Sequence, residues 1–437
     1  MEQQVWKAKM KKINTVSSDL VVDDEHHAFS PSQSADRGHV SALDKWLVQR
    51  SLALLGNPPI NMVLWNNEEI AGSQAKPVAK ILVRDRKSLY KLLRSPSLHL
   101  GDLYSTWRVD VEGDLVGFLE TINRSLRDSA GIHWLKKHLS WVWNRPRLNT
   151  LSGSKENIHY HYDISNAFYE MWLDNEMQYT CAYFPDPTMT LEAAQLEKMD
   201  HVCRKLQLKP GDTVVEAGCG WGGLARHMAR HYGALVRSYN ISHEQIAYAR
   251  DRARTEGLSD RVEYVEDDYR NISGKYDVFV SVGMLEHVGT EHYKKLGEVI
   301  HRSLSDHGRG LIHSIGRNRA GKMNPWIEKR IFPGAHPPSL REMMDIFEPR
   351  DFSVLDVENL RMHYARTLEH WLERYEAHTD EVGKMFDPAF VRAWRLYLSG
   401  SIAAFTTASL QLFQVTFARG ADNTIPWNRE HLYTHLD

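Results

Sequence analysis

Apolar and polar positions follow a regular pattern from about residue 213 onward. Short apolar runs typical of strands are followed by amphipathic segments typical of helices. The apolar runs are TVVEAG, ALVRSYN, VEYVEDD, YDVFVSVG, GLIHSI and FSVLDVENL, and two of the helical segments are SHEQIAYARDRARTEG and EHYKKLGEVIHRSL. This alternation predicts an α/β fold with a mostly parallel sheet covered on both faces, in which ligands lie beyond the carboxyl ends of the strands.

The first 150 residues have a different texture. AKILVRDRKSLYKLL predicts a strand and then a helix, and LGDLYSTWRVDVEGDLVGFLETI predicts a turn-rich segment and then a helix. We therefore expect a small α+β domain over residues 41–150, joined to a second domain over residues 151–437 through the linker NRPRLNTLSGSKEN, Asn144–Asn157. Residues 1–40 are polar and aperiodic, which predicts a disordered tail.

Two segments raise the question of a membrane. The stretch from Leu396 to Ala418 has no charged residue, but serine, threonine and glutamine interrupt it throughout. It therefore predicts a buried helix running into a final strand and not a membrane span. In WLKKHLSWVWNRPR, Trp134–Arg147, tryptophans alternate with basic residues, which suits a membrane interface. A solvated helix whose tryptophans pack on the next domain explains the same pattern.

Composition narrows the class of protein. The 437 residues are 25% charged and 42% hydrophobic with a net charge of −2, so the chain lacks the basic field of a nucleic-acid-binding protein. The N-terminus has no apolar core of a secretory signal. The three cysteines, Cys181, Cys203 and Cys219, form neither a C-x-x-C pair nor a metal-binding spacing. We expect a protein of the reducing cytoplasm without a metal site.

The stretch VVEAGCGWGGLARH, Val214–His227, ends the first of these strands in a glycine-rich turn. Its spacing is E-x-G-x-G-x-G, formed by Glu216, Gly218, Gly220 and Gly222, and not the G-x-G-x-x-G of a pyrophosphate cradle. Glu216 would repel a phosphate but suits an ammonium group or a ribose hydroxyl. The turn therefore favours S-adenosylmethionine over a dinucleotide, and a tight strand–helix turn without a ligand is the alternative.

The end of the second strand bears on the same choice. Many nucleotide sites have an acidic residue about 20 residues beyond the glycines. Here RSYNISHEQ offers Asn240, Ser242 and Gln245, but no carboxylate before Glu244. This sequence counts against a nicotinamide-dependent dehydrogenase.

Polar side chains follow the later strands as well. SVGMLEHVG places Glu286 and His287, and LIHSIG places His313 and Ile315, at the same edge of the predicted sheet. The aromatic stretch HYDISNAFYEMWLDNEMQYTCAYF ends in the more polar sequence YTC. Taken singly, each of these groups is also consistent with ordinary structural residues.

Together these motifs resemble the cyclopropane-fatty-acyl-phospholipid synthases and their mycolic-acid relatives. The resemblance runs from about Ser154 to Thr416 and extends more weakly into LGDLYSTWRVDVEGDL. Its motifs are HYDISNAFYEMWLDNEMQYTCAYF, EAGCGWGGLA, SVGMLEHVG, HSIG and NPWIEKRIFPGAHPPSL. It implies a class I, Rossmann-like methyltransferase domain that uses S-adenosylmethionine, preceded by the small α+β domain.

The resemblance implies two sets of site residues. The set that binds bicarbonate under the methyl donor is Cys181, Glu286, His313, Ile315 (through its backbone N–H) and Tyr364. The set that binds the donor is Tyr179, the turn Gly218–Gly222, Asn240, Ile241, Gln245 and Tyr269. The chain departs from the family's usual glycine and threonine in the loop after the second strand, where it has Ser238 and Asn240.

The implied reaction is methyl transfer to an alkene. The π electrons of a cis double bond attack the sulfonium methyl, and the resulting carbocation loses a proton from the transferred methyl as a cyclopropane ring closes. Bicarbonate is the implied base, because a charged side chain beside an apolar channel is costly to desolvate. Glu286 then orients the bicarbonate, and Cys181 need not be a nucleophile.

The N-terminal domain, which the short mycolic-acid enzymes lack, implies a membrane phospholipid with a cis-unsaturated acyl chain as substrate. The expected protein is a peripheral enzyme on the cytosolic face of the membrane, and its relatives imply a homodimer. Loss of a different proton would give a methylene- or methyl-branched chain. A lipid-binding or transfer protein with a vestigial catalytic domain is an alternative of another class. A nucleic-acid methyltransferase is disfavoured by the near-neutral charge and by the lack of an N-P-P-Y-type motif.

Overall fold

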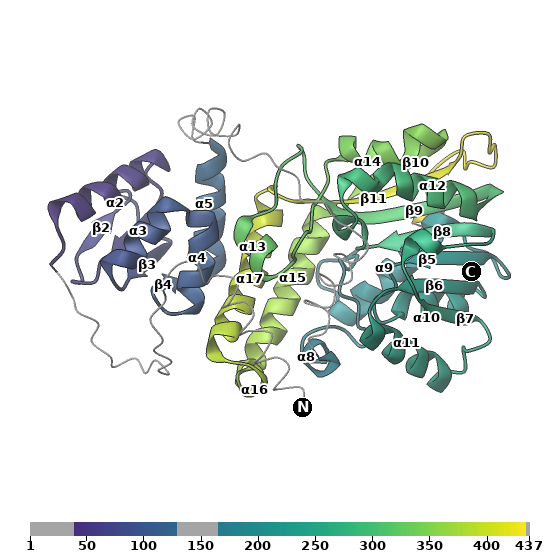
Figure 1. The fold of residues 1–437 in the computed structure, drawn as a ribbon, viewed down its shortest axis with the longest axis horizontal. Coiled ribbons are helices and arrows are strands. Elements are labelled where there is room, and N and C mark those ends of the chain that lie inside the picture. Colours follow the sequence, from purple (N-terminus) through teal and green to yellow (C-terminus); the bar gives the residue numbers. More distant parts are fainter. Residues whose placement is uncertain (1–38, 129–164, 434–437) are drawn as a thin grey trace. The chain divides into compact units, whose positions relative to one another are not determined.

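The computed structural model describes residues 39–128 and 165–433, which form two β-sheets with their covering helices (Figure 1). The predicted interfacial segment Trp134–Arg147 and the linker Asn144–Asn157 lie outside the described residues, as does almost all of the predicted tail over residues 1–40.

The N-terminal region, residues 39–128, is built on a four-stranded sheet in the order β2-β1-β3-β4. Strands β1 and β3 are parallel, and the other two pairings are antiparallel. Its strands are β1 (Ile60–Val63), β2 (Glu69–Ala71), β3 (Ala79–Val83) and β4 (Val109–Gly113), and its helices are α2 (Ala42–Leu54), α3 (Arg86–Arg94), α4 (Pro96–Ser105) and α5 (Leu115–Asp128). Buried aliphatic side chains from both layers, such as Val48, Ile81 and Leu89, form its core.

One prediction for this region is wrong. The strand and helix expected in AKILVRDRKSLYKLL are β3 and α3, but the segment expected to be turn-rich contains the end of α4 and strand β4 ahead of α5. Gly101 is the reason. It lies within α4, where a Cβ atom would come 2.1 Å from the Trp326 ring, so this glycine permits close packing and does not mark a turn.

The larger sheet has seven strands in the order β10-β11-β9-β8-β5-β6-β7. Only β11 runs antiparallel to its neighbours. The strands are β5 (Thr213–Ala217), β6 (Leu235–Asn240), β7 (Val262–Glu266), β8 (Tyr276–Val282), β9 (Leu304–Gly316), β10 (Phe352–Asn359) and β11 (Gln411–Arg419). All six predicted strands are confirmed, and the predicted α/β class with them.

Helices cover both faces of this sheet because successive strand side chains point to opposite sides. Val214 packs in a cluster with side chains of α9, α10 and α11, whereas the next residue, Val215, packs with side chains of α12 and α14. These helices are α9 (Leu191–Leu206), α10 (Gly223–His231), α11 (His243–Thr255), α12 (Tyr293–Ser303) and α14 (Leu340–Phe347). Side-chain caps begin three of them: Thr190 for α9, Ser242 for α11 and Ser339 for α14.

A further group of helices packs beyond the sheet on an aromatic cluster. Its members are α8 (Asn166–Glu170), α13 (Pro325–Arg330), α15 (Arg361–Ala377), α16 (Thr379–Met385) and α17 (Pro388–Thr406), and α15 and α17 lie side by side (Figure 1). Helix α17 leads into β11, which confirms the buried helix and final strand expected over Leu396–Ala418. In the described part of the chain, no helix is both long and apolar enough to cross a membrane.

Candidate active site

The glycine-rich turn connects the carboxyl end of β5 to α10. Gly218, Gly220 and Gly222 have φ angles of +87°, +51° and +78°, a region that other residues rarely adopt. An added Cβ would come 2.9 Å from Met284 at Gly218 and 2.5 Å from Tyr264 at Gly222, but would meet no atom within 4 Å at Gly220. Gly220 therefore leaves open space in front of the backbone, as a closely approaching ligand requires.

A cavity of about 110 Å³ lies at this turn. It is lined by Met177, Gln178, Tyr179, Thr180, Glu216, Gly218, Cys219, Gly220, Trp221, Leu224, Asn240, Gln245, Val282, Gly283, Met284 and His287. Glu216 is buried at the end of β5, where its carboxylate accepts a hydrogen bond from the Ser238 hydroxyl at 2.6 Å. Burial raises the pKa of Glu216 to about 7.

Asn240 joins the end of β6 to the glycine turn. Its side-chain amide donates to the Gly220 carbonyl at 3.2 Å and to Gln245 Oε1 at 2.8 Å, and its own oxygen accepts from the Ser242 backbone N–H. Amide groups therefore occupy the position where many nucleotide sites carry a carboxylate. Three predicted donor residues are not part of the cavity lining, so their role stays a prediction: Gly222 at the end of the glycine turn, Ile241 after β6 and Tyr269 after β7.

A second cavity, of about 510 Å³, adjoins the first. The five residues predicted to bind bicarbonate, Cys181, Glu286, His313, Ile315 and Tyr364, all line it. Much of the remaining wall is apolar and includes Leu100, Leu119, Ile327, Phe332, Leu368, Leu396, Ala404, Phe405, Leu410 and Leu412. Tyr179, Thr180, Gly283 and His287 line both cavities, so a donor in the first cavity would face a substrate in the second.

Glu286 is the acidic side chain on the wall of this larger cavity. It sits in a 3₁₀ turn after β8, and its Oε1 accepts a hydrogen bond from the Ile315 backbone N–H at 2.6 Å. Its Oε2 is buried without a hydrogen-bond partner among the described residues, and burial raises the pKa of Glu286 to about 7. The resemblance assigned the Ile315 N–H to bicarbonate, whereas here it donates to Glu286.

A chain of buried polar groups sets the protonation of His313. Lys205 Nζ donates to Gln414 Oε1 at 2.7 Å, and because a lysine can only donate, the amide nitrogen of Gln414 must face His313. That nitrogen lies 3.0 Å from His313 Nδ1, which therefore accepts. Burial lowers the pKa of His313 to about 3, so the ring is neutral and carries its proton on Nε2.

Glu358 completes this chain at its outer end. It accepts hydrogen bonds from Lys205 at 2.5 Å and from His201 at 2.7 Å. Burial opposes ionisation of Glu358, but the two hydrogen bonds outweigh it and lower its pKa to about 2. The carboxylate therefore balances the buried Lys205 ammonium.

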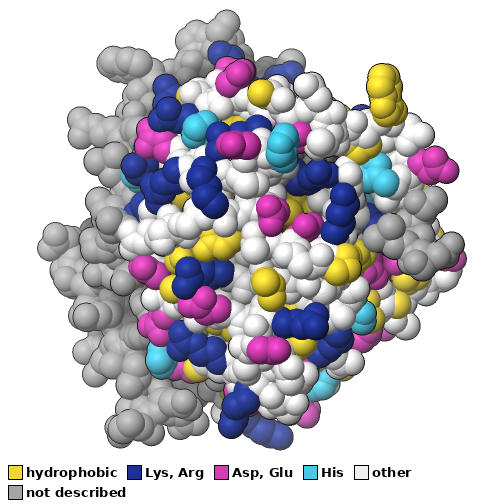
Figure 2. Space-filling model, turned by 90° about the vertical axis from the view of Figure 1, so that its right-hand side faces the viewer, with side chains coloured by type: hydrophobic (Ala, Val, Ile, Leu, Met, Phe, Trp, Pro, Cys, Tyr) yellow, Lys and Arg dark blue, Asp and Glu magenta, His cyan; other side chains and the backbone are white. Residues whose placement is uncertain are grey.

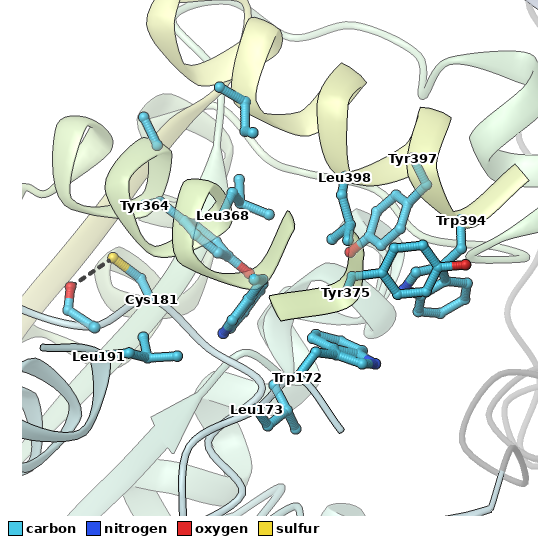
Figure 3. Packing of buried hydrophobic residues seen from close by; sticks show 14 of the residues in the cluster. Trp172, Leu173, Cys181, Leu191, Tyr364, Leu368, Tyr375, Trp394, Tyr397 and Leu398 are labelled. Atoms are coloured by element: carbon cyan, nitrogen blue, oxygen red, sulfur yellow. Dashed lines mark hydrogen bonds between the residues drawn. The ribbon is translucent and has the colours of Figure 1, made fainter. Parts of the chain in front are cut away.

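Cys181 and Tyr364 both belong to the buried hydrophobic cluster, and they lie at one side of its aromatic rings (Figure 3). The Cys181 thiol is buried and donates to the Ala182 carbonyl at 3.1 Å, and burial raises its pKa well above the usual range. A thiol in this state is not a thiolate nucleophile. The Tyr364 ring packs 4.6 Å from Phe405, centroid to centroid, which orients it at the cavity wall.

Helix α9 holds the loop that carries Tyr179, Thr180 and Cys181. Lys198 Nζ donates to Gln178 Oε1 at 2.5 Å and to the Thr180 hydroxyl at 3.0 Å, and Gln195 donates to the carbonyls of both residues. Burial lowers the pKa of Lys198 to about 8. The loop between the two cavities is thus fixed by buried hydrogen bonds.

Three buried residues that hold the site, Lys198, Lys205 and Gln414, belong to none of the sequence motifs described above. The signal that was present is the spacing of Lys198, His201 and Lys205, which recur every three or four residues on α9 and so share one helical face. Gln414 is likewise a polar residue in the middle of the otherwise apolar run QLFQVTFA.

Comparisons with known proteins agree with this arrangement. Residues 150–415 match the family model described as mycolic acid cyclopropane synthetase. The chain belongs to this family. A "Probable fatty acid methyltransferase" of Pseudomonas putida is 34% identical over 86% of this chain and 96% of its own length. The "Cyclopropane-fatty-acyl-phospholipid synthase" of Escherichia coli strain K12 is 37% identical over 79% of this chain and 89% of its own.

Solved structures of the family share the fold. The cyclopropane synthase MmaA2 from Mycobacterium tuberculosis superposes with a TM-score of 0.58 at 27% identity, covering 61% of this chain and 98% of that one. The mycolic acid cyclopropane synthase CmaA1, complexed with SAH and CTAB, gives the same TM-score at 28% identity with the same coverage. The protein is accordingly an S-adenosylmethionine-dependent methyltransferase, as the resemblance implied.

Proposed function

We propose that the protein transfers a one-carbon unit from S-adenosylmethionine to the cis double bond of a phospholipid acyl chain and closes a cyclopropane ring. The observation that carries this proposal is the junction of the two cavities. A polar cavity at the glycine turn meets a larger, mostly apolar cavity at Tyr179, Thr180, Gly283 and His287. Relatives described as a cyclopropane-fatty-acyl-phospholipid synthase and a probable fatty acid methyltransferase support the same chemistry.

The residues at the turn fit S-adenosylmethionine, which supplies an electrophilic methyl group when bound. Gly220 leaves room for S-adenosylmethionine to approach the protein backbone. The Glu216 carboxyl lines the same cavity and suits the ammonium group of the donor. The side-chain amides of Asn240 and Gln245 also line this cavity and are hydrogen-bonded to each other. These residues bind and orient the donor and take no part in proton transfer.

The apolar wall of the larger cavity aligns the alkene. A neutral double bond is a weak nucleophile, so holding it against the methyl must supply much of the rate, and such positioning contributes roughly 7–11 kcal/mol in favourable cases. Leu368, Leu396 and Phe405 exclude water around the reacting carbons. A low-dielectric wall also strengthens the effect of any negative charge on the carbocation.

The polar end of this cavity fits bicarbonate, which supplies a base for the methyl proton when bound. Two observations support the fit. Glu286 Oε2 is buried without a partner among the described residues. His313 lines the same cavity, and its ring proton is on Nε2 because Gln414 donates to Nδ1. With a pKa of about 7, the Glu286 carboxyl is able to donate as well as accept. We propose that Glu286, His313 and Tyr364 orient the anion.

The N-terminal region supports a phospholipid as substrate. Leu100 and Gly101 of α4 and Leu119 of α5 line the larger cavity, and Asp102 binds Arg330 of α13 at 3.0 Å. The region therefore forms part of the acyl-chain wall. From the family resemblance we also propose attachment to the cytosolic face of a membrane and assembly as a homodimer.

The test is incubation of the protein with S-adenosylmethionine, bicarbonate and vesicles of cis-unsaturated phospholipid, followed by mass spectrometry and proton NMR of the released fatty acids. A gain of one CH2 with upfield ring protons is the expected result. The same gain with vinylidene protons would instead establish a methylene-branching enzyme. Unchanged fatty acids with intact donor binding would refute the proposed acceptor.

A further inference from the structure

Helix α3 presents a strongly basic face. Four of its nine residues, Arg86, Lys87, Lys91 and Arg94, are exposed and share one side of the helix with Tyr90, and they line a shallow groove. The other side, which includes Leu89 and Leu92, is buried in the core of the N-terminal region, and the helix has no acidic residue.

Most of this positive charge is not neutralised by the protein. Arg86 binds Asp44 at 2.7 Å, but Lys87, Lys91 and Arg94 make no ion pair within the described residues. The face of the molecule shown in Figure 2 is different, because basic and acidic side chains are interspersed on it. The net charge of the chain is only −2, so the basic face is a local feature.

The basic face leads to the proposed acyl-chain cavity. Only Ser95 separates Arg94, the last residue of α3, from the start of α4, and Pro96, Ser97 and Leu100 of α4 line that cavity. On the same helix, burial and the charges of Lys91, Arg94 and Lys329 lower the pKa of His99, with Asp102 opposing them. Lys329 is exposed on α13, two residues after Ile327 of the cavity wall, and adds a positive charge near His99.

We propose that this face of α3, together with Lys329, docks the enzyme on an anionic phospholipid bilayer. The proposal rests on the proposed function, because it names the surface from which the substrate is drawn. Clusters of Lys and Arg bind anionic lipid surfaces, each residue strengthening binding by about fivefold. An apolar, acyl-sized cavity next to the cluster favours lipid over other polyanions. Docking here would bring phospholipid headgroups beside the cavity wall.

The test is co-sedimentation of the full-length protein with phosphatidylglycerol vesicles and, separately, with phosphatidylcholine vesicles. Wild type is expected to bind the anionic vesicles more tightly, with an affinity that falls as salt rises. The variant Lys87→Gln, Lys91→Gln, Arg94→Gln is expected to lose roughly 100-fold in affinity for phosphatidylglycerol. Affinity equal to that of wild type would overturn the proposal.

Two matched controls separate charge from disruption. Lys87→Arg, Lys91→Arg, Arg94→Lys keeps the charge and should bind as wild type does. Lys209→Gln, Lys294→Gln, Arg341→Gln removes three exposed cations from elsewhere on the chain and should also bind normally. Equal weakening in the remote control would show a net-charge effect and overturn the proposal.

Turnover and mass measurements complete the test. The triple Gln variant should convert phospholipid dispersed in neutral detergent at the wild-type rate but convert vesicles slowly, and an equal loss on both would overturn the proposal. A change in oligomeric mass with vesicle binding intact would assign α3 to a subunit interface instead. If wild type binds the vesicles but makes no product, the proposed function fails while the docking surface stands.

Discussion

Gln414 Nε2 lies 3.0 Å from His313 Nδ1 and donates to it. The hydrogen bond from Lys205 to Gln414 Oε1 prevents the Gln414 amide from turning over. Lys205 therefore sets the direction of the hydrogen bond between Gln414 and His313. The neutral ring then has its N–H at Nε2, the tautomer that can donate to an anion. The orientation of a site residue is thus determined by buried groups on α9 and β11.

Gln414→Glu tests this relationship. A carboxylate at position 414 still accepts from Lys205 but cannot donate to His313 Nδ1, so the ring proton is expected to move to Nδ1. We expect kcat to fall by about 10- to 100-fold and the KM for bicarbonate to rise, because positioning partners of site residues typically contribute factors of this size. The tautomer is read directly from the nitrogen-15 NMR shifts of the His313 ring.

Gln414→Met is the control, since it removes the amide without adding a charge. It should reduce activity without moving the proton to Nδ1. An unchanged Nε2–H tautomer in Gln414→Glu would show that Lys205 and Gln414 have no control over His313.

Glu286 makes stability depend on pH. Burial raises its folded pKa from 4.5 to about 7, so the folded state holds this proton more tightly than the unfolded state. The stabilisation is complete below about pH 4.5 and is lost as pH rises through 7. The side chain of Glu286→Gln cannot ionise. The free energy of unfolding of this variant minus that of wild type should therefore increase by about 1–3 kcal/mol between pH 5 and pH 8.

Urea unfolding of both proteins at several pH values measures this difference. Glu244→Gln, a change at an exposed position on α11, is the control and should show a flat difference. If the free energy of unfolding changes with pH in the same way for Glu286→Gln as for this control, Glu286 is not held protonated by burial.

The strands and the glycine turn could be predicted because their signals are local. Apolar runs of six to nine residues and the spacing of Gly218, Gly220 and Gly222 are visible without knowledge of the fold. The two cavities and the meeting of Glu286 with the Ile315 N–H depend on strand order, which the alternating pattern only constrains. The family resemblance, and not spacing, supplied Tyr364 and Tyr269.

The rest depends on contacts between distant segments. From the sequence alone, Lys205 would be expected at the surface. It is buried because β10 and β11 approach α9 and bring Glu358 and Gln414 against it. From the sequence alone, Gly101 would be expected in a turn. It lies in a helix because Trp326, more than 200 residues later, packs against it. Such residues carry no local signal because the partner that explains them is elsewhere in the chain.

Gly220 and Gly222 should respond differently to alanine. Both have positive φ angles, which cost a non-glycine residue roughly 1–2 kcal/mol. Gly222→Ala also drives a Cβ against the Tyr264 ring and should lower the melting temperature further, whereas Gly220→Ala meets only open space. We expect Gly220→Ala to weaken S-adenosylmethionine binding by tenfold or more with the smaller loss of stability. Calorimetric titration and thermal melts measure the two effects, and normal donor affinity in Gly220→Ala would remove the turn from the donor site.

Gly400 is a position at which the larger cavity can be partly filled without disturbing the fold. It lies on α17, lines the larger cavity, and an added Cβ would meet no atom within 4 Å. Gly400→Leu should fill part of the cavity and reduce turnover of long-chain substrates by at least tenfold, while donor binding stays normal. Gly400→Ala should stabilise the helix by about 0.5–1 kcal/mol and leave turnover nearly unchanged, because alanine is the better helix former. Full activity of Gly400→Leu on phospholipid would show that the acyl chain reaches the donor by another route.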